Sequence, residues 1–344
     1  MYRIKRILLP LLLLLVSASA AARRPQTVRV LQWNIWQEGT SVRGGFGAIV
    51  DELVRLQPDF VTLSEVRNYK NVNFTRRLCD SLQARGLKYY SFRSYDTGLL
   101  SRYPITDSVT VFPCNGDHGS IYKLKARAAG RTFCVYTAHL DYQDDAYYNV
   151  RGYDGSTWKE TERPKDVKEL LRLNDASWRD DAIRIFLNEA RHDTEEGALV
   201  IVGGDFNEPS WQDWTEATKD LYDHHGFVVP WTVTRLLTDN GFADAFRTVH
   251  PDPLTHPGFT YPSWNPAVPV SRLTWAPKAD ERERIDYIFY RGKGLRATNA
   301  RVFGPDSSVC RSKAERDPDA DTILLSLATW PTDHKGVLVE FSVE

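Results

Sequence analysis

The sequence predicts an α/β fold in which β-sheets carry helices on their outer faces. Short apolar segments typical of strands alternate with amphipathic segments from Val28 onward, and several strand-like segments follow one another at hairpin distance. No repeat, low-complexity run or Gly/Ser linker divides the 344 residues, of which 42% are hydrophobic and 12% aromatic. We therefore expect residues 27–344 to form a single domain.

The first twenty residues are typical of a signal peptide. A basic start, "MYRIKR", precedes the apolar run "ILLPLLLLLV" and the small-residue motif "SASA". The apolar run is shorter than the ~20 residues that a membrane span needs. We expect cleavage after Ala20 and export of the mature protein to the periplasm or the medium, with an uncleaved anchor as the alternative.

The first half of the domain begins with alternating strands and helices. "VRVLQWNIW" (28–36) and "DFVTLSEV" (59–66) predict strands, whereas "GAIVDELVRLQ" (47–57) and residues 74–84 predict helices. Strand-like segments then crowd together. They are "KYYSF", "GLLSRY", "SVTVF", "IYKLKARA" and "TFCVYTAHL".

The second half mixes one strong helix with strands and long loops. "RDDAIRIFLNEAR" (179–191) predicts a helix, "ALVIVGG" (198–204) a buried strand, and the chain closes on two strands, "ERIDYIFYR" and "KGVLVEFSV". The polar residues 141–177 and the aromatic-rich residues 255–282 are expected to be long loops. Loops of that length are usually functional or disordered.

Polar side chains recur where these strands end. Any one of them has an ordinary explanation, such as an Asx-turn or a hydrogen-bonded scaffold histidine. Together they are expected to meet at one side of the sheets, where buried carboxylates would be costly unless paired or bound to a cation. The residues are Asn34, Glu65, His139, Asp205, Asn207, Asp286, Asp333 and His334.

A divalent metal and an anionic ligand explain this set most economically. Hard oxygen donors such as the Asn34 amide and the Glu65 carboxylate suit Mg²⁺, Mn²⁺ or Ca²⁺. Zinc would require more histidine or cysteine. The G-x-S-x-G motif of serine hydrolases does not occur in the sequence, which disfavours a metal-independent hydrolase.

Six motifs, in order, resemble those of the endonuclease/exonuclease/phosphatase family. They are "QWNIW", "LSEV", "TAHLD", "GGDFNEP", "RIDYIF" and "TDHKGV", and the match extends from about Val30 to Phe341. The family includes DNase I, apurinic endonucleases, inositol polyphosphate 5-phosphatases and bacterial neutral sphingomyelinases. The resemblance implies a two-sheet β-sandwich flanked by helices, in four αββα layers, that hydrolyses phosphoesters with a divalent metal.

The resemblance also implies roles for individual residues. Asn34 and Glu65 look like the metal-binding pair, and Asp333 is similar to the family carboxylate near the metal. Asp205 resembles the residue that orients or deprotonates the attacking water, with Asn207 beside it contacting the phosphate.

His334 resembles the residue that contacts the scissile phosphate, held in place by Asp286. His139 in "TAHL" is similar to the second catalytic histidine of the DNase I and neutral sphingomyelinase branches. Apurinic endonucleases typically depart at this histidine, so that branch is disfavoured.

Charge and aromatic content narrow the substrate only in part. Removing Arg3, Lys5 and Arg6 from 44 basic side chains leaves 41 against 45 acidic ones, a net charge of −4, which weighs against nucleic acid as the main substrate. Phe259–Trp264, Trp211 and Trp214 are candidates for transient membrane contact or for stacking on a base or sugar, with a core position as the ordinary alternative.

We expect an exported, monomeric, metal-dependent phosphoesterase acting on a phosphodiester or phosphomonoester. The alternatives are a secreted nuclease similar to DNase I, a sphingomyelinase-like phospholipase C, and an inactive binding protein on the same scaffold. The polar insert 141–165 is expected to wall one side of the pocket and to select a small phosphodiester or a phosphorylated sugar.

Cys79, Cys114, Cys134 and Cys310 match no zinc pattern, and disulfides and isolated thiols are equally compatible with the sequence.

Overall fold

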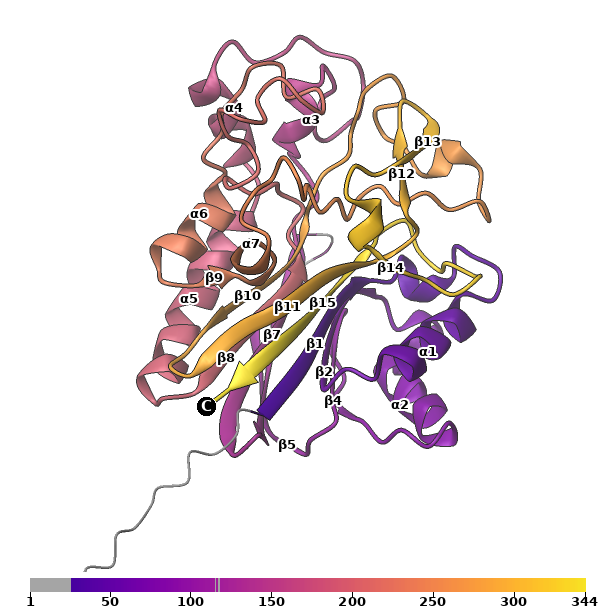
Figure 1. Cartoon of the computed structure of the whole chain (residues 1–344), viewed down its shortest axis with the longest axis vertical. Coiled ribbons are helices and arrows are strands. Elements are labelled where there is room, and N and C mark those ends of the chain that lie inside the picture. Colours follow the sequence, from indigo (N-terminus) through magenta and orange to yellow (C-terminus); the bar gives the residue numbers. More distant parts are fainter. Residues whose placement is uncertain (1–25, 115, 117) are drawn as a thin grey trace, which may run out of the picture.

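The computed structural model describes residues 26–114, 116 and 118–344, and the predicted signal peptide lies outside these residues. Two β-sheets stack face to face, and helices cover the outer face of each (Figure 1). This arrangement confirms the predicted four-layer αββα sandwich. In the described part of the chain no helix is both long and apolar enough to cross a membrane.

The first sheet has seven strands in the order β14-β11-β15-β1-β2-β4-β3. These strands are β1 (Gln26–Asn34), β2 (Phe60–Val66), β3 (Tyr90–Ser91), β4 (Asp96–Ser101), β11 (Leu295–Gly304), β14 (Leu324–Leu325) and β15 (Gly336–Val343). The second sheet has six strands in the order β5-β6-β7-β8-β10-β9. They are β5 (Ile105–Phe112), β6 (Gly119–Ala128), β7 (Arg131–Leu140), β8 (Leu199–Asp205), β9 (Ala243–Asp244) and β10 (Asp286–Arg291).

Helices α1 (Gly45–Leu56) and α2 (Phe74–Ala84) cover the first sheet, and α5 (Arg179–Glu195) and α6 (Thr232–Asp239) cover the second (Figure 1). Their apolar residues recur every three or four positions, so each helix buries one stripe. Helix α2 begins at an Asn73 cap, whose side chain accepts a hydrogen bond from the Arg76 N–H at 3.1 Å. The short helix α7 (Ala245–Val249) packs on β10 and β11.

The core is divided into layers by the alternation of side chains along each strand. Inward-facing residues such as Val30, Phe133 and Ile201 fill the space between the sheets. Outward-facing residues such as Trp33 and Tyr136 pack under the helices. The central strands are therefore buried on both faces, which explains their nearly continuous apolar sequences.

The sequence prediction is wrong for residues 141–177, which are not an unstructured loop. They contain α3 (Ala146–Val150) and α4 (Val167–Asn174), which with distant segments form a further apolar cluster at the top of Figure 1. Tyr147 and Tyr148 pack there with Trp214 and Trp231. This segment is polar on average, and its partners lie far away in sequence, so local periodicity does not reveal the helices.

The two predicted closing strands are confirmed as β10 and β15, but the prediction missed β11 and three short strands that lie between them. The short ones are β12 (Ser307–Cys310), β13 (Lys313–Arg316) and β14. Strand β11 has exposed residues only in its first half, and its register shifts between Ala297 and Asn299, which interrupts the alternation that a sequence reading depends on. The expected loop 255–282 is confirmed as irregular, with only the 3-10 turn Val270–Arg272.

Cys79, Cys134 and Cys310 are buried free thiols, which decides between the two readings of these cysteines in favour of isolated thiols.

Candidate active site

One edge of the sandwich collects the polar ends of six strands. Strands β1 and β2 run parallel, as do β7 and β8, so their carboxyl ends meet at the same edge. Strands β10 and β15 run antiparallel to them and begin there. The register pairs Asp205 with both His139 and Asp286, so these three residues are direct neighbours. The topology thus brings together the predicted site residues, as the sequence reading expects.

Glu65 reaches the site through a β-bulge. The pairing of β2 with β4 shifts between Ser64 and Val66, and Glu65 itself has a left-handed backbone with φ 66°. A non-glycine residue in this region carries strain that the surrounding structure must hold in place. Glu65 is held because its Oε1 accepts from Asn34 Nδ2 at 3.2 Å and its Oε2 from the Gln37 N–H at 3.0 Å.

Asp205 and Asn207 reach the same cavity by different means. Strand β8 ends at Asp205, and Asn207 lies beyond it in a left-handed turn with φ 48°, so simple strand alternation does not carry as far as Asn207. The Asn207 N–H donates to Asp205 Oδ1 at 3.0 Å, and its Nδ2 donates to the Leu140 carbonyl at 2.9 Å. Phe206 turns away into the outer core. The turn after β8 therefore holds the side chains of Asp205 and Asn207 in fixed positions at the cavity.

Beneath Asp205, Gly203 allows the two sheets to approach each other and Gly204 allows a close contact with the neighbouring strand β7. A Cβ atom on Gly203 would lie 2.3 Å from Thr62 Oγ1 of the opposite sheet, and one on Gly204 would lie 2.3 Å from the Ala138 carbonyl oxygen. The side chains between the sheets become polar at this level, where Thr62 Oγ1 donates to Gln32 Oε1 at 2.5 Å. A hydrogen-bonded layer thus separates the apolar core from the site.

His334 is held from behind by this polar layer. Its Nδ1 lies 2.9 Å from Asp286 Oδ2, and Asp286 Oδ1 accepts from Gln32 Nε2 at 3.3 Å. Its Nε2 points toward Asp205 Oδ2 at 3.7 Å. A carboxylate on Nδ1 fixes the orientation of the ring and leaves Nε2 to face the cavity.

His139 has an equivalent partner that sequence reasoning missed. Its Nδ1 lies 3.0 Å from Asp96 Oδ2, and its Nε2 lies 3.9 Å from Asp205 Oδ2. Asp96 also accepts from Arg67 at 2.7 Å, and Arg67 lies 3.8 Å from Glu65 Oε2. The only signal in the sequence was an aspartate opening a strand, which is ordinarily a turn residue.

Both histidines are cationic at neutral pH. Burial lowers the pKa of His139, but the Asp96 carboxylate more than offsets it and raises that pKa to about 9. Burial likewise opposes the charge on His334, whereas Asp286 and Asp205 raise its pKa to about 10. The pKa of Asp205 is itself raised by burial, against the opposing effect of His334. Asp205 therefore lies between two imidazolium groups that point toward it.

Glu65 and Asp333 offer an oxygen site that suits a divalent cation. Burial and the nearby Glu65 charge together raise the pKa of Asp333 to about 7, against the opposing effect of His334. A cation shared by the two carboxylates would offset both the burial of the Asp333 charge and its repulsion by Glu65. These residues therefore fit the predicted metal. Asn34 connects this pair to Asp205, because its Nδ2 donates to Glu65 and, at 2.9 Å, to Asp205 Oδ2.

A second group of possible ligands lies in the same site. Asp205, Asp286 and His334 place one ligand atom each within 4.8 Å of one another. Their charges are already largely balanced, because His334 bridges the two carboxylates and is cationic. The Glu65–Asp333 pair therefore has more to gain from a cation.

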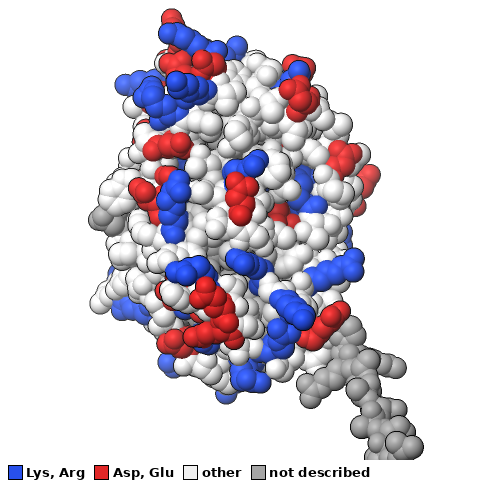
Figure 2. Space-filling view, turned by 90° about the vertical axis from the view of Figure 1, so that its left-hand side faces the viewer, with Lys and Arg blue, Asp and Glu red and all other residues white. Residues whose placement is uncertain are grey.

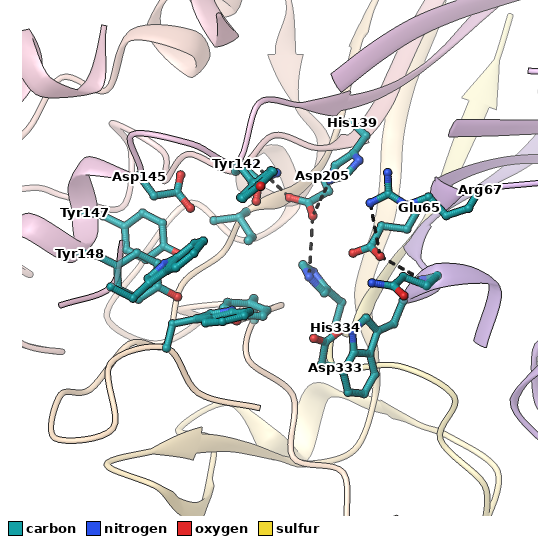
Figure 3. Close-up of a pocket in the computed structure, with 17 residues that line it drawn as sticks. Glu65, Arg67, His139, Tyr142, Asp145, Tyr147, Tyr148, Asp205, Asp333 and His334 are labelled. Atoms are coloured by element: carbon teal, nitrogen blue, oxygen red, sulfur yellow. Dashed lines mark hydrogen bonds and ion pairs between the residues drawn. The ribbon is translucent and has the colours of Figure 1, made fainter. Parts of the chain in front are cut away.

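The site opens into a cavity of about 540 Å³. Six of the eight predicted site residues line it, and Asn34 and Asp286 stand directly behind as hydrogen-bond partners. Figure 3 shows Glu65 and Arg67 on one side of Asp205 and His334, and Asp145, Tyr147 and Tyr148 on the other. Tyr142, Asp145, Tyr147, Tyr148 and Trp158 belong to the polar insert, which confirms the expectation that it walls the pocket.

Most aromatic residues considered for membrane contact are not available for it. Trp214 is fully buried, with its ring stacked on His224 at 3.7 Å, and Phe259 is buried as well. Both residues lie in the protein interior. The sequence did not reveal this, because the residues that cover them come from distant segments. Within Phe259–Trp264, Tyr261 lines the cavity and its ring lies 4.7 Å from that of His334.

Comparison with known proteins places these observations in a family context. Residues 31–334 match the Endonuclease/Exonuclease/phosphatase family. Over 301 residues the chain is 28% identical to a Caenorhabditis elegans protein, Uncharacterized protein F14F9.5, and the match covers 84% of this chain and 86% of that protein.

The fold is similar to two solved structures at 17% sequence identity. The first is D. rerio TDP2 complexed with single strand DNA product, with a TM-score of 0.52 over 92% of this chain and 98% of that chain. The second is the endonuclease/exonuclease/phosphatase from Beutenbergia cavernae DSM 12333, with a TM-score of 0.52 over 93% of this chain and 72% of that chain. At this identity the likeness establishes the architecture and leaves the substrate open.

Proposed function

The chain belongs to the Endonuclease/Exonuclease/phosphatase family, whose members are typically hydrolases of phosphoesters, and on this premise we propose that it is an exported, divalent-metal-dependent phosphoesterase. It hydrolyses a phosphodiester or phosphomonoester by attack of water. Support for export comes from the residues at the start of the chain, with their basic, apolar and small-residue order.

One observation carries the proposal, namely the position of Asp205 between two carboxylate-supported histidines. Asp205 Oδ2 lies 3.7 Å from His334 Nε2 and 3.9 Å from His139 Nε2, and accepts from Asn34 Nδ2 at 2.9 Å. Phosphoryl transfer requires a positioned nucleophile and fixed positive charge around the phosphate oxygens. This arrangement provides both.

Each residue then has a defined task. Asp205 orients the attacking water and accepts its proton, because its carboxylate is fixed by Asn34 and by the Asn207 N–H. His334 and His139 donate from Nε2 to the non-bridging phosphate oxygens, since Asp286 and Asp96 occupy their Nδ1 atoms. Glu65 and Asp333 would hold the divalent metal, which supplies Lewis-acid neutralisation of the phosphate charge.

Two alternative activities use the same chemistry, a secreted nuclease and a sphingomyelinase-like phospholipase C. On the face shown in Figure 2, Lys and Arg side chains alternate with Asp and Glu, without the continuous basic track that a polyanion would follow. Together with the net charge of −4 expected for the mature chain, this leads us to favour a small soluble phosphoester over DNA or RNA. An inactive binding protein is disfavoured because the histidines, their carboxylate partners and Asp205 are all in place.

A chelation assay tests the proposal directly. The mature protein is assayed with bis(4-nitrophenyl) phosphate and 4-nitrophenyl phosphate, in EDTA and after addition of Mg²⁺, Mn²⁺ or Ca²⁺. Turnover is expected only with metal, and His334→Ala or Asp205→Ala should lower kcat by at least ~10²-fold. Full activity of either variant would contradict the mechanism, and activity that persists in EDTA would contradict the metal requirement.

A further inference from the structure

The half of the cavity opposite Glu65 has a composition that the phosphoryl chemistry does not use. Six aromatic side chains form it, and we call them the aromatic wall. They are Tyr142, Tyr147, Tyr148, Trp158, Tyr261 and Trp275. The proposed hydrolysis does not account for so many aromatic rings, because a phosphate binds through charge and hydrogen bonds. The wall is therefore placed to contact the organic part of the ester.

The aromatic wall is preorganised. Tyr142 and Trp158 are stacked with their rings 6.1 Å apart and 5° between planes, and Trp158 stacks in turn on Trp275 at 4.6 Å. Trp275 ends this stack with 49% of its surface exposed, which is unusual for a tryptophan held in a rigid turn. A rigid, partly exposed ring at a cavity mouth offers contact area at little entropic cost.

Buried polar residues fix the wall in this arrangement. Glu281 accepts from the backbone N–H of Trp275 and of Ala276, each at 3.1 Å, and from Tyr148 Oη at 3.2 Å, so it ties the turn to the tyrosines. Arg179 holds the other edge, because its guanidinium donates to the Asp141 carbonyl at 2.8 Å and to Asp145 Oδ1 at 3.0 Å. The wall is thus part of the folded framework and does not depend on a ligand to form.

The charge of the cavity is asymmetric. Its cationic lining residues are Arg67, His139 and His334, and all three contact the carboxylates of the catalytic side. On the side of the aromatic wall the described lining residues include the carboxyl group of Asp145 but no lysine or arginine, because Arg179, which pairs with Asp145, is buried and does not line the cavity. A second phosphate would find no counterion among the lining residues on this side, which disfavours an organic part with negative charge.

Asp145 gives this side hydrogen-bonding capacity. It is buried, and its bond with Arg179 engages Oδ1. Burial raises the pKa of Asp145 well above its ordinary value, against the effect of Arg179. With the hydroxyl groups of the tyrosines, it offers several donors and acceptors beside apolar ring faces.

We infer that the aromatic wall and Asp145 form a subsite for a sugar ring, so that the substrate is a small phosphoester of an uncharged sugar. A sugar ring presents an apolar C–H face to an aromatic ring and several hydroxyl groups at its edge, which matches a cavity lined by both the exposed Trp275 ring and the Asp145 carboxyl group. A cavity of about 540 Å³ is large enough for one such ring with its phosphate. This inference rests on the proposed phosphoesterase function.

A matched substrate series tests the subsite. Methyl phosphodiesters of glucose, of adenosine and of propanol carry the same reacting phosphate, and kcat/KM is measured for each with added Mg²⁺. The sugar ester is expected to be preferred over the propyl ester by roughly tenfold or more, mainly through KM. Trp275→Ala and Asp145→Asn should each reduce this preference roughly tenfold. Trp178→Ala is the control, because Trp178 is 40% exposed and does not line the cavity, and it should leave the preference unchanged.

A binding measurement separates failure of the subsite from failure of the catalytic proposal. Saturation-transfer NMR with a panel of methyl glycosides and myo-inositol needs no turnover, and binding should be lost in Trp275→Ala but kept in Trp178→Ala. Equal kcat/KM for all three esters, or a preference for adenosine, would overturn the sugar subsite and leave the phosphoesterase intact. Absence of metal-dependent hydrolysis of every ester would overturn the proposed function, and absence of glycoside binding would then overturn the subsite as well.

Discussion

At the scale of single residues, the site depends on carboxylates that stand one step behind the reacting groups. Asp96 and Asp286 each contact the Nδ1 atom of a histidine, at 3.0 Å and 2.9 Å, and so decide its charge and orientation. Sequence motifs indicated both histidines and Asp286. They did not indicate Asp96, because its pairing with His139 joins β4 of one sheet to β7 of the other and leaves no local pattern.

Asp96→Asn should move the alkaline limit of activity. The pKa of His139 is raised to about 9 because the Asp96 carboxylate outweighs burial, so wild-type kcat/KM should stay level through neutral pH and fall as His139 loses its proton. The folded pKa lies above the unfolded value of ~6.5, so this pair stabilises the fold fully below that value and loses its effect as the pH rises through about 9.

In Asp96→Asn burial lowers the pKa of His139 without the opposing effect of the Asp96 carboxylate. The alkaline limb of the profile should therefore shift to lower pH, and the rate at neutral pH should fall by roughly 10²-fold. The measurement is a pH profile of kcat/KM for the wild type and for Asp96→Asn, recorded with an endpoint assay. Asp80→Asn, an exposed aspartate paired with Arg76 on α2, is the control and should keep the wild-type profile. An unshifted limb in Asp96→Asn would show that His139 does not act as a cation.

At the scale of secondary-structure elements, the ends of strands determine the site more than their interiors do. The sequence predicted the central strands and helices α2 and α5 because each buries a regular apolar pattern. It could not reveal the bulge that turns Glu65 into the cavity, since a bulge depends on the partner strand. The helices within 141–177 were missed for the same reason, because their stability comes from Trp214 and Trp231.

Gly203→Ala should disturb His334 without touching it. A methyl group at Gly203 would meet Thr62 Oγ1 at 2.3 Å, and Thr62 donates to Gln32, which in turn donates to Asp286 behind His334. Overpacking of a tight contact between sheets typically costs ~1–3 kcal/mol. We expect a lower free energy of unfolding by denaturant and a kcat reduced at least ~10-fold with little change in KM.

Gly47→Ala is the matched control, because a Cβ atom there meets nothing within 4 Å. This variant should keep the wild-type stability, or gain slightly from the better helix propensity of alanine, and should keep the wild-type kcat. If Gly203→Ala lowered stability and left kcat unchanged, the polar layer beneath the site would be a packing feature alone.

At the scale of the whole molecule, metal binding and folding are linked, because a cation that binds only the folded site stabilises the entire sandwich. Without metal, the folded state bears the free-energy cost of an ionised Asp333, because burial and Glu65 raise the pKa of this residue to about 7. This cost can be measured in the protein without metal. The folded state therefore loses stability as the pH rises from the unfolded value of ~3.9, and the loss is complete above about 7. Asp333→Asn should therefore raise the melting temperature in EDTA at about pH 8, although it removes a proposed metal ligand.

With metal the order should reverse. A cation at 100 times its Kd stabilises the folded state by ~2.7 kcal/mol, which raises the melting temperature of a chain of this size by several degrees. Wild type should show this saturable rise with Mg²⁺ or Mn²⁺, whereas Asp333→Asn and Glu65→Gln should not. If the rise survived in both variants but disappeared in Asp205→Asn, the cation would lie instead among Asp205, Asp286 and His334, whose ligand atoms fall within 4.8 Å of one another. Because His334 would then have to give up its bond to Asp286 or Asp205 to bind the cation, it could no longer serve as the cationic donor to the phosphate. Differential scanning calorimetry of four proteins thus decides which set of carboxylates binds the metal and whether His334 is left to act on the substrate.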